Sequence, residues 1–216
     1  MRVLIGGEFN GKIRDAFRRL GHDAWSCDFR PTAVPGPHYR CDWWNIIPEG
    51  WDLAIFHPTC TFMANSGAKH LFLGMKKENG LNEERWLAMG RDAWNFWRLL
   101  NCKIERVCLE NPVMLGYAQL MVGVKPQIIH PWEHGHRKMK ATALWLKNLP
   151  RIAPTNNVGP PPSDAAERYK WQDVFRMAPT ADPEIRRMAR SETYQGIADA
   201  FADQWGGMAF QNSNAA

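Results

Sequence analysis

A single cysteine follows a short apolar run in the stretch DLAIFHPTCTFMANSG, residues 52–67. The run predicts a buried strand, and Cys60 would lie just past its end, after Pro58 and Thr59. Backbone amides and helix dipoles at a strand exit can stabilise a thiolate, which is the nucleophilic form of cysteine. A structural cysteine usually lies within a strand, as we expect for Cys108. Position alone leaves both interpretations of Cys60 open.

A glutamate ends a second apolar run, IERVCLE, residues 104–110. Glu110 is followed by Asn111 and Pro112, so it stands where the chain leaves the predicted strand. We expect partial desolvation there, which raises the pKa of a carboxyl group. Such an acid can donate a proton or a hydrogen bond to a ring nitrogen. The alternative is an ordinary acid paired with a lysine or an arginine.

A glycine-rich turn and two isolated acids mark the N-terminal part of the chain. The turn GGEFNG, residues 6–11, lets the backbone approach a ligand and opens a helix N-terminus, although it lacks the GxGxxG spacing. Asp28 closes a predicted strand, where an acid can accept hydrogen bonds from ribose hydroxyls. Asp42 could accept from an adenine amino group. Taken singly, Asp28 is typical of a turn and Asp42 of a solvated carboxylate.

Apolar runs alternate with helical repeats along the chain. This alternation predicts a single α/β domain whose doubly wound, mostly parallel, Rossmann-like sheet is covered on both faces. Ligands bind at the carboxyl ends of such strands, so the turn, the acids and the cysteine should share one crevice. The predicted strands are 1–5, 22–28, 51–56, 104–110 and 142–146. Three helices are predicted. The first has Ile13, Ala16, Phe17 and Leu20 on one face and ends before Gly21, the second spans 83–100 and is capped by Asn82, and the third spans about 192–205.

Composition sets broad limits on the class of protein. Of the 216 residues, 45% are hydrophobic and 23% are charged, as in ordinary globular proteins. Many of the 11 tryptophans must lie in the core, but aromatic faces also provide stacking surfaces for bases. The net charge of +5 favours a polyanionic partner and fits a basic enzyme equally well.

Several classes of protein are disfavoured by simple patterns. The sequence has no uncharged apolar stretch of about 18 residues, so we expect no membrane span, and its N-terminal run is too short for a signal peptide. The 5 cysteines are odd in number and show no CxxC spacing, which argues against a disulfide framework and a zinc ribbon. A reducing cytoplasm fits best.

Taken in order, these pieces resemble the C5-cytosine DNA methyltransferases, most closely the short methyltransferase-like proteins that bacteriophages encode. VLIGGEFNGKIRDAFRRLGHDAWSCD resembles the cofactor region of that family, and DLAIFHPTCTFMANSG resembles its Pro-Cys nucleophile motif. VCLENPVM resembles the Glu-Asn motif, and SETYQGIADAFADQW resembles the closing helix of the cofactor pocket. The resemblance covers about residues 2–120 and 190–206.

The resemblance implies a class I fold that binds S-adenosylmethionine and methylates cytosine C5 in DNA. Cys60 would add transiently to C6 while Glu110 stabilises the ring at N3, and the target base would be flipped out of a duplex. Residues 1–150 would form the catalytic core, 151–190 a proline-rich loop or reduced recognition region, 191–206 a helix returning to the core and 207–216 a tail. If a phage encodes the chain, the cytoplasm is that of the host.

The same resemblance assigns further residues to ligands. The cofactor would contact Gly6, Gly7, Glu8, Phe9, Asn10, Gly11, Asp28, Asp42 and Pro58. The substrate would contact Thr59, Thr61, Asn65, Ser66, Asn111, Pro112, His136, Arg137 and Lys140.

Three departures from the family pattern affect these expectations. Thr59 stands directly before the cysteine where the family has proline, and Pro112 stands where the larger enzymes usually have valine. The sequence has neither a Gln-Arg-Arg-type motif nor a long target-recognition region. The substrate would then be something other than a long duplex, or its recognition would come from elsewhere.

The basic stretch HPWEHGHRKMK, residues 130–140, is a candidate for the missing contacts. Lys140 or Arg137 could replace the absent arginine at a phosphate or base. A zinc site formed by His130, His134 and His136 is an alternative, although no fourth ligand is near in sequence. A solvated basic loop is the third interpretation.

Three other functions remain open from the sequence. An amino-methyltransferase also pairs a glycine-rich turn with a proline motif, but it needs an aromatic residue where this chain has Cys60. A C5-modifying enzyme could act on a free pyrimidine nucleotide, which mononucleotide binding against a gel shift would separate from DNA binding. A catalytically silent, nucleic-acid-binding relative would be unaffected by loss of the thiol. No feature of the sequence indicates the oligomeric state.

Overall fold

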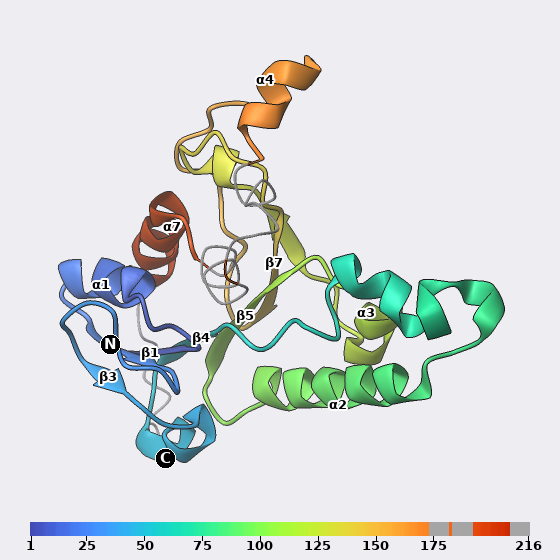
Figure 1. Ribbon diagram of the computed structural model, residues 1–216. Helices are drawn as coiled ribbons and strands as arrows, with labels where there is room; N and C mark the ends of the chain where they lie inside the picture. Colours follow the sequence, from blue (N-terminus) through green and yellow to red (C-terminus); the bar gives the residue numbers. More distant parts are fainter. Residues whose placement is uncertain (173–181, 183–191, 208–216) are drawn as a thin grey trace.

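The computed structural model describes residues 1–172, 182 and 192–207, and its centre is a seven-stranded sheet in the order β3-β2-β1-β4-β5-β7-β6 (Figure 1). The strands that were expected from apolar runs occupy its middle, which agrees with the burial of most of their residues. The strand bounds are Arg2–Gly6 (β1), Asp23–Cys27 (β2), His38–Tyr39 (β3), Leu53–Phe56 (β4), Arg106–Pro112 (β5), Gln127–Ile129 (β6) and Thr142–Lys147 (β7).

Strand direction brings several chain segments to one edge of the sheet. The pairings among β3, β2, β1, β4 and β5 are parallel, whereas β7 pairs antiparallel with both β5 and β6. Gly6 pairs with Phe56, and Phe56 pairs with Leu109, so the ends of β1 and β4 are level with Leu109 of β5. Strand β5 continues to Pro112 along β7, so Glu110 lies within the strand rather than at its end, where it was expected. The segments that follow these three strands therefore meet.

Helices cover both faces of the sheet (Figure 1). On one face, Val3 and Ile5 pack in a cluster with Phe17 and Phe201, which come from α1 (Lys12–Arg19) and α7 (Gln195–Gly206). The alternate side chain of the same strand, Leu4, belongs to the cluster on the other face, because neighbouring strand residues point to opposite sides. That second face is covered by α2 (Glu83–Leu100) and α3 (Gly116–Val122).

The long helix α2 begins and runs as its sequence predicts. The Asn82 side chain accepts a hydrogen bond from the Arg85 amide at 3.1 Å, which satisfies one of the unpaired N–H groups of the first turn. Met89, Phe96 and Leu100 repeat at helical spacing and are buried against the sheet. Phe96 meets the ring of Trp145 edge-on, at 4.9 Å between ring centroids.

Some elements were not expected from the sequence. Strand β3 lies in the proline- and glycine-rich segment 29–39, and the short β6 and α3 carry too few residues for a periodic signal. The helix α4 (Ala165–Lys170) interrupts the segment expected to be a loop, and it projects away from the sheet (Figure 1). The closing helix begins at 195 rather than 192. Short 3-10 helices occupy Trp43–Asn45, Ile47–Glu49, Asn65–Leu71, Leu73–Met75, Lys77–Asn79 and Pro131–Glu133.

The expected α/β class with a mostly parallel sheet is confirmed, with the two antiparallel pairings of β7 as the exception. Part of the expected recognition region, at 173–181 and 183–190, lies outside the described residues, as do residue 191 of the expected closing helix and most of the expected tail, at 208–216. Among the helices that the structure describes, none combines the length and apolar character needed to cross a membrane.

Two glycines in helices should respond oppositely to substitution by alanine. A Cβ at Gly196 would overlap the carbonyl oxygen of His134, so we expect Gly196→Ala to lower the free energy of unfolding by about 1–3 kcal/mol. A Cβ at Gly90 would enter open space, so Gly90→Ala should raise the free energy of unfolding by about 0.5–1 kcal/mol. Urea unfolding of the two variants measures the difference. Equal effects would contradict this account of how α7 packs.

Candidate active site

Hydrogen bonds join the segment after β4 to the segment after β5. The Asn111 side-chain amide donates to the Pro58 carbonyl at 3.1 Å. Further along, the Asn65 amide donates to the Val113 carbonyl at 3.0 Å, and the Leu115 amide donates to the Met63 carbonyl at 2.8 Å. Because these bonds lie on both sides of the cysteine, they hold the Cys60 segment against the Glu110 segment.

Cys60 is partly buried and lies within the electrostatic reach of two charged groups. Burial raises the pKa of its thiol, and the negative charge of Glu110 raises it further, while Lys140 acts in the opposite direction. The net pKa is above the usual value. The expectation that strand-end amides would favour a thiolate is therefore wrong for this structure, because desolvation outweighs them and the resting group is a thiol.

Glu110 is largely buried, and His57 is its closest charged or polar partner. The Glu110 Oε2 atom lies 3.0 Å from His57 Nδ1. Burial alone would raise the pKa of Glu110, but the hydrogen bond and charge of His57, together with Lys140, bring it below the usual value. The expected upward shift is thus wrong, and the carboxylate is held in its charged form by neighbouring cations.

Lys140 reaches the same centre from the segment that leads into β7. Its Nζ atom donates to the Glu192 carbonyl oxygen at 2.8 Å and lies 5.8 Å from the Tyr194 ring centroid. Burial lowers the pKa of Lys140, and the negative charges of Glu110, Glu192 and Cys60 counteract that shift. A lysine, a carboxylate and a thiol therefore form one cluster, which we call the thiol cluster: Cys60, Glu110 and Lys140.

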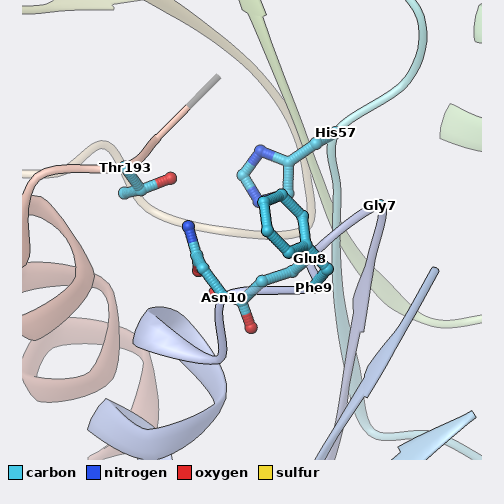
Figure 2. A pocket seen from close by; sticks show the side chains of 6 residues that line it. All are labelled: Gly7, Glu8, Phe9, Asn10, His57 and Thr193. Carbon is cyan, nitrogen blue, oxygen red and sulfur yellow. The ribbon is translucent and has the colours of Figure 1, made fainter. Parts of the chain in front are cut away.

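A pocket lies between the glycine-rich turn and the start of α7. Its lining residues are Gly7, Glu8, Phe9, Asn10, His57 and Thr193 (Figure 2). Gly7 has a positive φ of 79°, and a Cβ there would lie 2.6 Å from the His57 carbonyl oxygen. Only glycine fits this close approach without strain, so the turn keeps the backbone next to the end of β4.

Glu8 supports the turn from inside the protein. It is only 4% exposed, and its two carboxylate oxygens accept hydrogen bonds from the Ile13 and Arg14 amides at 2.7 and 3.2 Å. Burial raises the pKa of Glu8, against the effect of these amides and of His57. The carboxylate caps α1, whose N-cap residue Gly11 has no side chain to do so. Glu8 was expected to contact a cofactor, but the structure uses both of its oxygens within the protein.

Asp28 and Asp42 follow β2 and β3 at the same edge of the sheet. One oxygen of Asp28 accepts a hydrogen bond from the Arg30 amide at 2.9 Å, and one oxygen of Asp42 accepts from the Trp44 amide at 3.0 Å. Both acids are half-buried, and each is fixed by the turn that follows it. The Arg30 guanidinium, two residues after Asp28, stands 5.0 Å from the centroid of the Phe9 ring.

The residues expected to touch a substrate divide into two groups. Thr59, Thr61, Asn65, Ser66 and Pro112 are exposed around Cys60. Asn111 is buried, and its side-chain oxygen has no hydrogen-bond partner among the residues that the structure describes. An unpaired buried acceptor at the rim of the thiol cluster is suited to an amino group of a ligand.

The histidines of segment 130–140 serve separate structural contacts. His130 stacks on Trp132, His134 Nδ1 lies 3.1 Å from the Thr155 hydroxyl, and His136 Nε2 accepts from the Gly196 amide at 3.0 Å. Over the described part of the chain, no three His, Cys, Asp or Glu side chains gather as metal ligands, so the zinc alternative lacks support. His136 is half-buried, whereas Arg137 is exposed.

The sequence analysis did not single out His57, Glu192, Thr193 or Tyr194. His57 was treated only as part of the strand exit. In the structure, its carbonyl oxygen lies directly opposite Gly7. Residues 192–194 reach the site only because α7 packs beside α1 and brings its leading segment across the edge of the sheet (Figure 1). No local spacing signals a contact made over such a distance along the chain.

Comparisons with known proteins found one kind of similarity, in the course of the backbone. No protein-family model matches this sequence, and no curated protein matches it. Among solved structures, the chain is similar to an E. coli protein encoded within a prophage and provisionally described as a DNA modification methyltransferase. Identity is 14% and the TM-score is 0.46, with 73% of this chain and 51% of that chain covered. The chain thus spans about half the length of that protein, and the comparison alone assigns it no activity.

The charges around Cys60 predict how fast it reacts with iodoacetamide near neutral pH. Glu110→Gln removes the negative charge that raises the pKa of the thiol, so more thiolate forms and alkylation should become faster. Lys140→Met removes an opposing positive charge and should slow the reaction. Peptide mapping by mass spectrometry separates Cys60 from the other cysteines.

Glu105→Gln is the matched control for this measurement, because the exposed Glu105 precedes β5 at the end of the strand remote from Glu110. Its rate of alkylation should equal that of the unaltered protein. A slower reaction in Glu110→Gln, or a faster one in Lys140→Met, would contradict the electrostatic arrangement of the thiol cluster.

Proposed function

We propose that this chain is an S-adenosylmethionine-dependent methyltransferase that methylates C5 of cytosine in DNA through a transient bond between Cys60 and C6. The observation that carries the proposal is the thiol cluster, in which a cysteine, a carboxylate and a lysine from three separate segments share one electrostatic environment. The cluster adjoins the glycine-rich pocket through His57. The motif resemblance and this convergence are independent reasons for the same chemistry.

The pocket has features that fit S-adenosylmethionine. The turn at residues 6–11 leaves no room for side chains at Gly6 and Gly7, so the backbone can line a ligand directly. Beyond it, Asp28 keeps a second carboxylate oxygen that could accept from ribose hydroxyls, and Asp42 could do the same for an adenine amino group. The Trp43 indole nitrogen is buried without a partner among the described residues, which leaves a donor for the same ligand.

In this scheme the bound cofactor supplies an electrophilic methyl group, and Pro58, Phe9 and Asn10 help to shape its site. Glu8 acts indirectly, because it holds the turn and the first helix in place. The remaining chemistry belongs to the side chains of this chain.

The proton inventory follows from the resting states of Cys60 and Glu110. The thiol must lose its proton before sulfur can attack C6, and the Glu110 carboxylate can take it up, directly or through water. Protonated Glu110 then donates to N3 as the C6–S bond forms and the electron pair moves towards C5. After C5 has taken the methyl group, a base such as water removes the C5 proton, and its electron pair re-forms the C5–C6 double bond as the C6–S bond breaks. N3 returns its proton to Glu110, which passes it back to the leaving sulfur, so that the carboxylate and the thiol are both regained.

Lys140 and Asn111 complete the contacts of the flipped base in this proposal. The Lys140 ammonium, held by the Glu192 carbonyl, provides positive charge where the attacked ring gathers negative charge, and so replaces the arginine that the sequence lacks. The free oxygen of Asn111 can accept from the exocyclic amino group. Arg137, which is exposed, is available for a phosphate, with Thr59, Thr61, Asn65, Ser66 and Pro112 around the entrance.

Covalent trapping tests the proposal. DNA that contains 5-fluorocytosine should form a stable adduct with the protein and S-adenosylmethionine, because fluorine at C5 cannot leave as a proton does. Cys60→Ala should abolish the adduct and lower methyl transfer by about three orders of magnitude or more. Cys102→Ala removes a thiol packed in the core beneath the sheet, so it serves as a control that keeps trapping.

Three results would overturn the proposal. An adduct that persists in Cys60→Ala would assign the covalent step to another group. Cofactor binding without adduct or transfer on any DNA would favour the silent nucleic-acid-binding relative, and transfer to a mononucleotide without any to DNA would identify the free nucleotide as the substrate.

A further inference from the structure

His57 joins the two halves of the proposed site. Its Nδ1 atom lies 3.0 Å from Glu110 Oε2, and its side chain is 13% exposed. Its other ring nitrogen, Nε2, is buried and has no hydrogen-bond partner among the residues that the structure describes. Leaving such a nitrogen unpaired is unfavourable, so a buried ring nitrogen that lacks a protein partner is suited to a hydrogen-bond partner from a ligand.

The His57 ring lines the pocket at the glycine-rich turn. Figure 2 shows the imidazole, the Asn10 amide and the Thr193 hydroxyl pointing towards the same space. These are polar groups from three separate segments, namely the end of β4, the turn after β1 and the residues before α7. Their convergence suits a ligand group that both accepts and donates hydrogen bonds, such as the amino-acid end of the cofactor.

The backbone around His57 fixes where its ring stands. The His57 amide donates to the Gly6 carbonyl at 2.8 Å, and the absence of a side chain at Gly7 allows the His57 carbonyl to pack against the turn. The ring therefore stays between the pocket and β5. The charged and titratable groups that face it are Glu8 from the turn and Glu110 from β5, with Lys140 and Cys60 beyond the latter.

We propose that His57 is a positioning residue that links the cofactor pocket to Glu110: Nδ1–H holds the carboxylate, and Nε2 bonds to the polar end of the bound molecule. This inference rests on the proposed function. Because ionised Glu110 can only accept, Nδ1 must carry a hydrogen. Nε2 is then an acceptor in the neutral ring and a donor in the doubly protonated ring.

Two substitutions separate the two roles. The side-chain amide of asparagine reaches where Nδ1 stands, and that of glutamine reaches where Nε2 stands. His57→Asn should keep the hydrogen bond to Glu110 and weaken binding of S-adenosylhomocysteine by about 5- to 10-fold, the worth of one hydrogen bond. His57→Gln should bind S-adenosylhomocysteine within about 3-fold of the unaltered protein and raise the pKa of Glu110, because the donor to its carboxylate is lost.

Neither readout needs methyl transfer. Calorimetry measures S-adenosylhomocysteine binding, and carbon NMR of labelled glutamate carboxyls follows the titration of Glu110, which Glu110→Gln assigns. His70→Asn, at an exposed histidine remote from the pocket lining, is the matched control and should change neither quantity. Thermal unfolding of each variant verifies that it folds, and His57→Ala, which lacks both contacts, should combine the two losses.

The proposal is overturned if both substitutions change binding and titration together, since that marks a role in folding only. It is overturned equally if neither changes, or if the unaltered protein does not bind S-adenosylhomocysteine. A protein that binds the probe and shows the predicted split, yet transfers no methyl group, would refute the proposed function and leave the link through His57 standing.

Discussion

The burial of one carboxylate governs the rest of this site. Taking Glu110 out of water would by itself favour its protonated form, and an unpaired buried charge costs several kcal/mol. His57 on one side and Lys140 on the other reverse that preference. The carboxylate in turn raises the pKa of Cys60 and counteracts the lowering of that of Lys140. Burial is the larger influence on the thiol and on the lysine, and the charge of Glu110 acts on both in the same direction, raising their pKa values.

The sheet makes this arrangement possible without any contact local in sequence. The ends of β1 and β4 are level with Leu109 of β5, which places the glycine-rich turn, Cys60 and Glu110 at one edge. The Asn111 bond to Pro58 then locks the last two segments together. Two further segments complete the site from a distance, namely the approach to β7 with Lys140 and residues 192–194 before α7. The site therefore depends on the whole fold.

Much of this could be read from the sequence because the signals are local. Buried strands appear as apolar runs, and α2 appears complete with its Asn82 cap. The strand-end position of Cys60 follows from the same runs, although β5 continues past Glu110. Electrostatics could not be read in this way. The charge states of Cys60 and Glu110 depend on burial and on neighbours such as Lys140 and His57, whose approach is set by tertiary packing. Strand β3 was not predicted for another reason: it has only two residues, and hydrophobic periodicity cannot be detected over so short a span.

The sequence also did not reveal which expected ligand contacts have structural partners within the protein. Glu8 lies in the cofactor-like turn, yet the amides at the start of α1 take both of its oxygens. His136 lies in the basic stretch, yet it accepts from the Gly196 amide. In both cases a helix N-terminus with unpaired N–H groups recruits the nearest acceptor. A motif considered residue by residue does not show that a helix N-terminus competes with a ligand for the same acceptor, because the helix begins elsewhere in the chain or at the next turn.

The most direct test of the central claim is the identity of the methylated base. DNA would be incubated with the protein and isotopically labelled S-adenosylmethionine, digested to nucleosides and analysed by mass spectrometry. The account predicts label in 5-methylcytosine, because a thiol that adds to C6 activates C5. Label in N4-methylcytosine or N6-methyladenine, or no label from a protein that binds the cofactor, would contradict it.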